Sequence, residues 1–343
     1  MCSLMKRAEE RITLWWKDKV SEYMRGIYFD GGKAVYREDL PKPVPAQGES
    51  LIRILMAAVC NTDKEIVKGY RPDFCGVMGH EFIGMVEKSP NRALIGTRVA
   101  GELNAACGKC IYCKTGRPTH CSNRRVLGMH DKDGCFAEYM TIDTKLLHPV
   151  PDKLSAEKAI YTEPLAAAFE ILTQIDVHGP DKNIAVLGDG RLAYCVVQAL
   201  HAVGKEVTVI GKHPEKLALF EPFAEVSTQW EPEGYEIVVE ATGSPTGIRQ
   251  AMEMVRKKGT IVLKSTYAGE TSLPMSLIAV NEISIIGSRC GPFEPALEAL
   301  SEGRAVFPEI TLFDLKEFEK AFDYKGFKAG FRFSPQFCED SAD

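Results

Sequence analysis

Two different patterns of hydrophobic and polar residues divide the chain. Before about residue 147, short apolar and β-branched runs are separated by Asn, Pro and Gly, which is typical of strands joined by turns. The expected strands are SLIRILMAAVC (50–60), EFIGMVEKS (81–89), GTRVAGEL (96–103) and CFAEYMTI (135–142). Short strands connected in this way predict a compact β barrel or sandwich.

From about residue 183, the pattern predicts strands that alternate with helices. Buried strands are expected at 183–188, 206–211, 235–243, 259–265 and 283–288. Helices are expected at 191–203, 213–220, 246–257, 293–304 and 314–323. This alternation is typical of a doubly wound parallel sheet, so the predicted fold class is α/β with a separate β-rich part.

The composition is that of a soluble globular protein long enough for two domains, with 343 residues, 45% of them hydrophobic and 26% charged. The net charge of -5 gives no long-range attraction to phosphate backbones, so no nucleic acid partner is expected. No apolar run is long enough to span a membrane, and the first residues carry too many charges, including Glu9 and Glu10, for a signal or transit peptide. We therefore expect no membrane association and a cytoplasmic location, where disulfides rarely persist.

Four of the 11 cysteines lie together in CGKCIYCKTGRPTHC (107–121), with gaps of two, two and seven residues: Cys107, Cys110, Cys113 and Cys121. Paired thiols at such short spacing are typical of tetrahedral structural zinc. An iron–sulfur cluster is the alternative, but its compact pattern ends in a three-residue gap and a proline, whereas Ser122 follows here. Four unliganded thiols so close together would oxidise, so we expect a metal that also stabilises this polar loop.

The first strand of the predicted parallel sheet runs into GDGRLA, which begins the next helix. Gly188, Gly190 and Ala193 fit the pattern G-x-G-x-x-G/A. Such glycines let the backbone approach a pyrophosphate at the positive N-terminus of the helix. Between a strand and a helix, the pattern predicts a dinucleotide site; the alternative is a plain turn in a sheet that binds nothing.

Three separate fragments contain further residue types that bind metals: AVCNTDKE has Cys60, MGHEFIG has His80 and YTEPLAAAFE has Glu163. Individually, the cysteine could be a small buried hydrophobe, the histidine a hydrogen-bonded core residue, and the glutamate a helix cap beside Pro164. Together, a Cys, a His and a Glu could ligate zinc and leave its fourth position open for a substrate.

The ordered motifs CNTD, GHE, the four-cysteine lobe, DGCFAEY (133–139), EPLA, GDGRLA and EATG resemble the zinc-containing medium-chain dehydrogenase/reductase family of alcohol and polyol dehydrogenases. The resemblance runs from about Met24 to the end of the chain. It implies an N-terminal extension (1–23), a GroES-like catalytic domain (24–150) with the structural zinc lobe (107–121), a Rossmann domain (151–289) and a C-terminal segment (290–343) that completes the catalytic domain. It also implies a homodimer or homotetramer and a small-molecule alcohol as the substrate.

The resemblance further implies a second, catalytic zinc with these ligands: Cys60, His80 and Glu163. Polyol dehydrogenases are similar in having glutamate where many alcohol dehydrogenases have a second cysteine, and Glu81 is the alternative ligand. Asp63 would accept a hydrogen bond from the other ring nitrogen of His80. Thr62 would carry away the proton of the zinc-bound alcohol while a hydride passes to the nicotinamide.

The cofactor implied by the resemblance is NADP or NAD. Its candidate binding residues lie on the glycine turn, after the second parallel strand and in EATG: Gly188, Gly190, Arg191, Leu192, Gly211, Lys212, His213, Thr242 and Gly243. Sheets that bind NAD usually carry Asp or Glu about 20 residues past the glycine turn, where it holds the ribose 2′-hydroxyl, but Gly211 stands there. Lys212, His213 and Arg191 favour a 2′-phosphate instead, so the sequence predicts NADP. The alternative is that these basic side chains are only solvated and both cofactors are used.

Three functions compete for this set of motifs. The predicted one is a zinc-dependent NAD(P) dehydrogenase that acts on a secondary alcohol, a polyol or a sugar. A non-enzymatic NAD(P)-binding regulator is an alternative, but it would not need a complete open metal site. A zinc-independent quinone-type reductase of the same superfamily would lack Cys60, His80 and the four-cysteine lobe.

Removal of residues 1–23 tests the extent of the fold. MRGIYFDGGKAVYRE (24–38) resembles the opening strand pair of the family, so a chain that begins at Met24 is expected to fold and to turn over substrate as the full chain does. Circular dichroism and steady-state kinetics measure the two properties. Loss of either one would mean that the extension packs on the body of the protein.

Overall fold

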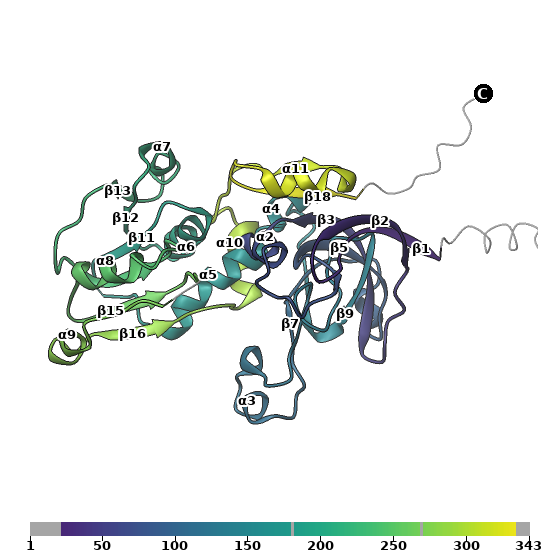
Figure 1. The fold of residues 1–343 in the computed structure, drawn as a ribbon, viewed down its shortest axis with the longest axis horizontal. Helices are drawn as coiled ribbons and strands as arrows, with labels where there is room; N and C mark the ends of the chain where they lie inside the picture. Colours follow the sequence, from purple (N-terminus) through teal and green to yellow (C-terminus); the bar gives the residue numbers. More distant parts are fainter. Residues whose placement is uncertain (1–21, 180–181, 268–269, 334–343) are drawn as a thin grey trace, which may run out of the picture.

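The computed structural model describes residues 22–179, 182–267 and 270–333. Most of the predicted N-terminal extension therefore lies outside the described residues, and the first strand begins at Tyr23. Figure 1 shows two groups of strands with helices between them, and a loop around α3 that stands away from both groups. Within the described ranges, no helix is long and apolar enough to cross a membrane.

The β-rich part consists of two sheets and a separate two-stranded ribbon, β7-β8. One sheet has the order β2-β1-β4, and the larger one has the order β10-β6-β5-β3-β18-β17, with β9 also paired to β3. The strands are β1 (Tyr23–Phe29), β2 (Ala34–Pro41), β3 (Glu49–Ala58), β4 (Gly76–Val77), β5 (Glu81–Lys88), β6 (Arg98–Gly101), β7 (Asn104–Ala105), β8 (Arg125–Val126), β9 (Tyr139–Asp143), β10 (Leu147–Pro149), β17 (Thr311–Phe313) and β18 (Ala329–Arg332). Because β18 pairs with β3, residues near the C-terminus complete a sheet that begins near the N-terminus.

The second part is a six-stranded parallel sheet in the order β13-β12-β11-β14-β15-β16. Its strands are β11 (Ile184–Leu187), β12 (Thr208–Ile210), β13 (Glu225–Ser227), β14 (Tyr235–Glu240), β15 (Val255–Leu263) and β16 (Ser284–Gly287). The strand order reverses between β11 and β14, and ligands of such sheets bind beside this point at the carboxyl ends of the strands. The predicted doubly wound α/β class with a β-rich part is thus confirmed.

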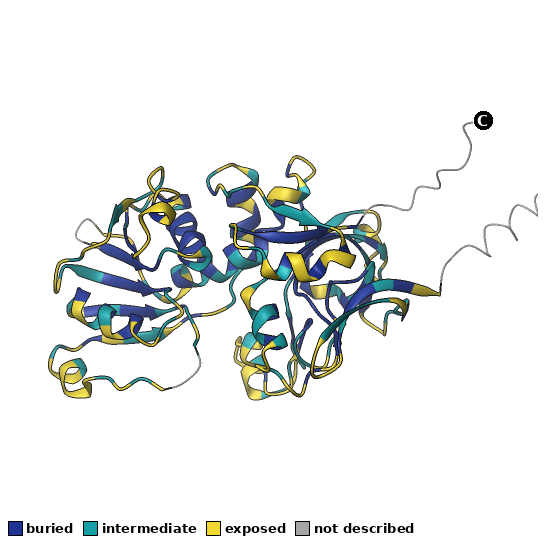
Figure 2. Cartoon of the chain, turned by 45° about the horizontal axis from the view of Figure 1, so that its top comes forward, coloured by how far each residue is buried: buried dark blue, intermediate teal, exposed yellow. Residues whose placement is uncertain are grey.

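Most helices of the described chain cover the parallel sheet or lie between the two parts, whereas α11 packs on β17 and β18 and α3 lies in the loop that stands away from both. The helices are α2 (Asn61–Val67), α3 (Ile111–Lys114), α4 (Ala156–Ala159), α5 (Thr162–Gln174), α6 (Arg191–Ala202), α7 (Pro214–Leu217), α8 (Gly247–Met254), α9 (Met275–Val280), α10 (Phe293–Ser301) and α11 (Phe318–Asp323). One continuous buried cluster joins Ala58 and Ile83 of the larger β sheet to Leu165 on α5, Val196 on α6 and Leu297 on α10. Burial of apolar surface therefore holds the two parts together, and Figure 2 shows the buried residues of both parts.

Two sequence expectations are wrong in detail. The helix predicted at 246–257 ends at Met254, because Val255 opens β15 by pairing with Tyr235 of β14. Conversely, no helix was predicted at 61–67, where α2 forms and where Asp63 closes the first turn. At Val255, pairing with a distant strand overrides the local pattern, whereas the helix at 61–67 begins with a local hydrogen bond from the backbone N of Cys60 to Asp63.

His148 on β10 connects the β-rich part to α10. Its Nε2 lies 2.9 Å from Oε1 of Glu102, its Nδ1 lies 3.1 Å from Oε1 of Glu294, and its ring stacks on Phe293. Burial alone would lower the pKa of His148, but the hydrogen bond to Glu102 and the charge of Glu294 raise the pKa above its ordinary value. The folded chain therefore stabilises the protonated imidazole.

The raised pKa of His148 makes stability depend on pH. Its contribution is complete below the unfolded pKa of about 6.5 and is lost as the pH rises through the higher folded pKa. His148→Gln is therefore expected to lower the free energy of unfolding more at pH 6 than at pH 9, as measured by urea titration. His201→Gln, at an exposed histidine of α6, is the matched control. An equal loss at both pH values for His148→Gln would contradict this assignment.

Candidate functional site

A candidate metal centre lies where β3, β5 and α2 meet. Cys60 precedes α2, and His80 and Glu81 stand at the start of β5. The antiparallel pairing of β3 with β5 puts Ala58 opposite Glu81, so the end of one strand and the start of the other reach the same edge. One ligand atom each from Cys60, His80 and Glu81 lies within 4.8 Å of the other two. A sulfur, an imidazole nitrogen and a carboxylate at this separation fit one zinc ion.

Asp63 on α2 holds two of these residues in position. Its Oδ2 accepts a hydrogen bond of 2.8 Å from the backbone N of Cys60, and its Oδ1 lies 3.3 Å from Nδ1 of His80. Burial alone would lower the pKa of His80, but Asp63 and Cys60 raise the pKa well above its ordinary value. A carboxylate behind a histidine orients the ring as a metal ligand, which is the role predicted for Asp63. Thr62 lies beside the same centre, with its Oγ1 3.7 Å from Sγ of Cys60.

A buried cation that sequence analysis did not identify contacts the centre. Lys328 directly precedes β18, and its Nζ forms an ion pair with Oε2 of Glu81. The pairing of β18 with β3 brings Lys328 to this edge, because Gly330 faces Ala58. Burial lowers the pKa of Lys328, but the charges of Glu81 and Cys60, together with the hydrogen bond to Glu81, raise the pKa above its ordinary value. The other oxygen of Glu81, Oε1, is buried with no hydrogen-bond partner in the described part of the chain, so it is free to bind a metal.

Glu163 stands on the first turn of α5 and is not one of the three converging ligands. Burial and the negative charge of Glu81 raise the pKa of Glu163 to about 7, whereas His80 and Lys328 oppose the rise. Glu163 therefore lies close enough to Glu81, His80 and Lys328 for their charges to change its pKa. Its role as the third zinc ligand stays a prediction.

The four predicted thiols converge in the loop around α3. All four sulfur atoms lie within 4.8 Å of one another, and Sγ of Cys110 lies 3.5 Å from that of Cys113 and 3.8 Å from that of Cys121. A tetrahedron with zinc–sulfur bonds of about 2.3 Å has edges of roughly 3.8 Å, so these separations fit zinc. Backbone N–H groups of Cys113 and Ser122 lower the pKa of Cys110 to about 6, which favours the thiolate that binds metal.

The glycine turn joins β11 to α6 next to the metal centre. Gly188 has a φ of +129°, and a Cβ there would lie 2.8 Å from the carbonyl O of Ala241, so glycine is required. A Cβ at Gly190 would meet nothing within 4 Å, which leaves open space before Arg191, the first residue of α6. Burial lowers the pKa of Lys64 on α2, and the charge of Arg191 lowers it further. The open helix N-terminus thus lies within electrostatic reach of α2 and the metal centre.

Glu240 at the end of β14 organises the EATG segment. Its Oε1 accepts hydrogen bonds of 2.8 Å from the backbone N and 2.5 Å from Oγ1 of Thr242, and its Oε2 accepts one of 2.5 Å from Oγ of Ser265. This buried carboxylate therefore ties together the loops that follow β14 and β15. Gly243 follows with a φ of +68°, while Leu192 on α6 packs against the core.

The segment after β12 surrounds the side chain of Asp189. Oδ2 of Asp189 accepts hydrogen bonds from the backbone N of Lys212 (2.7 Å), the backbone N of His213 (3.0 Å) and Nδ1 of His213 (2.8 Å). Gly211 is buried, whereas Lys212 and His213 are exposed. The chain thus brings these predicted cofactor residues together, but around a carboxylate that sequence analysis did not consider.

Sequence analysis missed four charged residues near the predicted sites: Asp189, Glu240, Lys264 and Lys328. Lys264 follows β15, and its Nζ donates to the carbonyl O of Ala167 and to Oγ of Ser288. Burial lowers the pKa of Lys264 to about 8. Three of these four residues lie at or just past the carboxyl end of an expected parallel strand. This position is a signal that could have identified them. Lys328 had no such signal, because it precedes its strand.

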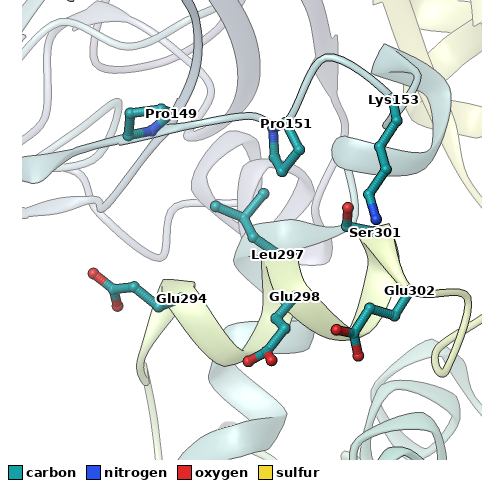
Figure 3. A pocket seen from close by; sticks show the side chains of 8 residues that line it. All are labelled: Pro149, Pro151, Lys153, Glu294, Leu297, Glu298, Ser301 and Glu302. Atoms are coloured by element: carbon teal, nitrogen blue, oxygen red, sulfur yellow. The ribbon is translucent and has the colours of Figure 1, made fainter.

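A surface hollow of about 380 Å³ lies apart from these groups, between Pro151, Lys153 and α10. Figure 3 shows Glu298 on α10 and Glu302 directly after this helix at the margin of the hollow. None of the predicted site residues lines it.

Comparisons with known proteins agree with this geometry. Residues 46–152 match the family described as Alcohol dehydrogenase GroES-like domain, and residues 192–302 match Zinc-binding dehydrogenase. An alcohol dehydrogenase of Rhizobium meliloti (strain 1021) is 32% identical over 80% of this chain and 86% of that protein. A sorbitol dehydrogenase of Halalkalibacterium halodurans is 27% identical over 85% of this chain and 92% of that protein.

Solved structures show the same fold. A short chain alcohol dehydrogenase of Escherichia coli CFT073, complexed with NADH, has a TM-score of 0.81 at 25% identity and covers 91% of this chain and 100% of that one. A dehydrogenase from Sinorhizobium meliloti 1021, bound to NADP, has a TM-score of 0.82 at 22% identity and covers 90% and 99% of the two chains. The expected GroES-like and Rossmann architecture is confirmed, and the chain belongs to the zinc-containing medium-chain dehydrogenase/reductase family, whose alcohol and polyol dehydrogenases are oxidoreductases.

Proposed function

We propose that this chain is a zinc-dependent dehydrogenase that transfers a hydride between NAD(P) and a secondary alcohol, a polyol or a sugar. The observation that carries the proposal is the convergence of one ligand atom each from Cys60, His80 and Glu81 within 4.8 Å. The glycine turn lies nearby, since the charge of Arg191 affects the pKa of Lys64 and of Lys328. Relatives named sorbitol dehydrogenase and erythritol/L-threitol dehydrogenase support the polyol class.

The donor set fits a Lewis-acidic metal, because a buried carboxylate oxygen of Glu81, which has no hydrogen-bond partner among the described residues, stands beside a cysteine and a histidine. Zinc bound to Cys60, His80 and either Glu81 or Glu163 would lower the pKa of an alcohol bound there. Asp63 would fix the ring of His80, and we assign to Thr62 a relay role: its Oγ would accept the alcohol proton while its own hydroxyl proton passes on to solvent, as the hydride passes to the nicotinamide. Zinc content of Glu81→Gln and Glu163→Gln identifies the third ligand, because only the variant that lacks a true ligand is expected to lose the metal.

The alternatives explain less of the chain. A regulator that only binds cofactor would not need the buried centre, and a zinc-independent reductase would not need four converging cysteines. No disulfide joins any of the nine cysteines in the described part of the chain. The cytoplasmic location stays a prediction. The homodimer or homotetramer stays a prediction. Oxidation of a panel of alcohols, polyols and sugars with NAD or NADP tests the proposal; no turnover of any member would contradict it.

The choice between NAD and NADP is open to two opposing arguments. Gly211 in place of an acidic residue and the exposed Lys212 and His213 support the predicted preference for NADP. The carboxylate of Asp189, which accepts hydrogen bonds from both basic residues, opposes it.

Cys60→Ser tests the catalytic metal. The variant is expected to fold normally, to lose one zinc per chain, and to lose about a thousandfold or more in kcat/KM, because several kcal/mol of Lewis-acid stabilisation disappear. Cys75→Ser, at an exposed thiol, is the matched control and should change neither zinc content nor kcat/KM. Near-normal turnover by Cys60→Ser would exclude the proposed centre.

Elemental analysis of protein purified without chelator tests the number of metals. We expect two zinc ions per chain in the wild type and one in Cys107→Ser, which should also have a lower Tm because the lobe loses a metal that supports its fold. Cys75→Ser is again the control. One zinc per chain in the wild type, or iron, would show that one of the two ligand sets is assigned wrongly.

A further inference from the structure

Asp189 occupies the second position of the glycine turn, yet its side chain reaches the end of β12. Its Oδ2 accepts all three hydrogen bonds that come from Lys212 and His213. Among the described residues, the charged neighbour of its Oδ1 is the distant Nζ of Lys216, at 3.8 Å. Burial would raise the pKa of Asp189, but the hydrogen bonds from Lys212 and His213 outweigh burial and lower the pKa. One oxygen of a firmly anchored anion is therefore left to accept a further hydrogen bond.

Gly211 and Asp189 share one space. A Cβ at Gly211 would lie 2.8 Å from Cβ of Asp189, 3.0 Å from its Oδ2 and 2.8 Å from Cδ2 of Leu217. Any side chain at 211 would thus displace the carboxylate of Asp189. This is the position at which dinucleotide-binding sheets usually carry the acidic residue that holds the ribose 2′-hydroxyl. A carboxylate therefore does occupy this position, but it belongs to Asp189 on the glycine turn and not to a residue at the end of the second strand.

We propose that Asp189 selects the cofactor: it accepts a hydrogen bond from a hydroxyl of the adenosine ribose and repels a 2′-phosphate, so the chain prefers NAD(H). This inference rests on the proposed NAD(P)-dependent function and reverses the preference expected from the sequence. Because Asp189 also pairs with His213, a 2′-phosphate would have to displace an internal anion before this imidazole could bind it. Lys212 and His213 then serve to anchor Asp189 rather than to bind a phosphate.

Binding of ADP-ribose and of 2′-phospho-ADP-ribose tests the proposal, because both probes lack the nicotinamide and report on the adenosine half alone. Isothermal titration calorimetry of the full chain is expected to give a Kd at least tenfold lower for ADP-ribose. Asp189→Asn, which keeps the shape and removes the charge, should reduce this ratio tenfold or more. Asp189→Ser should do the same, and kcat/KM for NAD and NADP should follow the Kd values.

Glu215→Gln is the matched control, because it removes an equal charge from an exposed residue of the neighbouring α7. It should leave the ratio unchanged. If Asp189 had only a structural role, Asp189→Asn would weaken the binding of both probes equally and leave the ratio of the two Kd values unchanged. An unchanged ratio, or a wild-type preference for 2′-phospho-ADP-ribose, therefore overturns the assignment of Asp189 and leaves the proposed function intact. Failure of the wild type to bind either probe overturns both.

Discussion

The pairing of β3 with β5 on one side and with β18 on the other is the constraint on which the candidate chemistry depends. Ala58 faces both Glu81 and Gly330, so the end of β3 brings Cys60 beside His80 and close to Lys328. Backbone groups inside a sheet must be hydrogen-bonded, which makes this arrangement rigid. A slip of one residue would turn the side chains of β5 to the opposite face and disperse the ligands.

Charge balance is the second constraint on the centre. Asp63, His80, Glu81 and Lys328 are all buried, and burial of ions is costly unless each is paired. The Glu81–Lys328 ion pair joins opposite charges, and the carboxylate of Asp63 faces the ring of His80. Glu163 adds a further carboxyl group, and burial together with the negative charge of Glu81 raises its pKa to about 7. A divalent cation would pair with these buried carboxylates, so this donor set suits a metal.

The carboxyl edge of the parallel sheet is organised by two carboxylates. Asp189 ties the glycine turn to the segment after β12, and Glu240 ties the loop after β14 to the loop after β15. Each acid therefore fixes two loops relative to each other before any cofactor arrives. Preorganisation of this kind lowers the entropic cost of binding. The two carboxylates thus hold the loops at the carboxyl edge of the sheet in place, where the cofactor is expected to bind.

The sequence by itself determined the features whose physical requirements are local. The spacing of Cys107, Cys110, Cys113 and Cys121 suits one metal, and the glycine turn needs a positive φ at Gly188, so both features are visible in short windows. The alternation of strands and helices likewise predicted the α/β class and the β-rich part.

Only the tertiary structure decided which distant groups meet. Pairing of β18 with β3 brought Lys328 to Glu81, and the approach of the glycine turn to β12 put Asp189 where Gly211 leaves room. It also put Glu81 rather than Glu163 among the converging ligands, and it converted the predicted helical end at Val255 into a strand. The reason is the same in each case: hydrogen bonds between strands and loops far apart in the chain fix these positions, and no local window of sequence contains both partners.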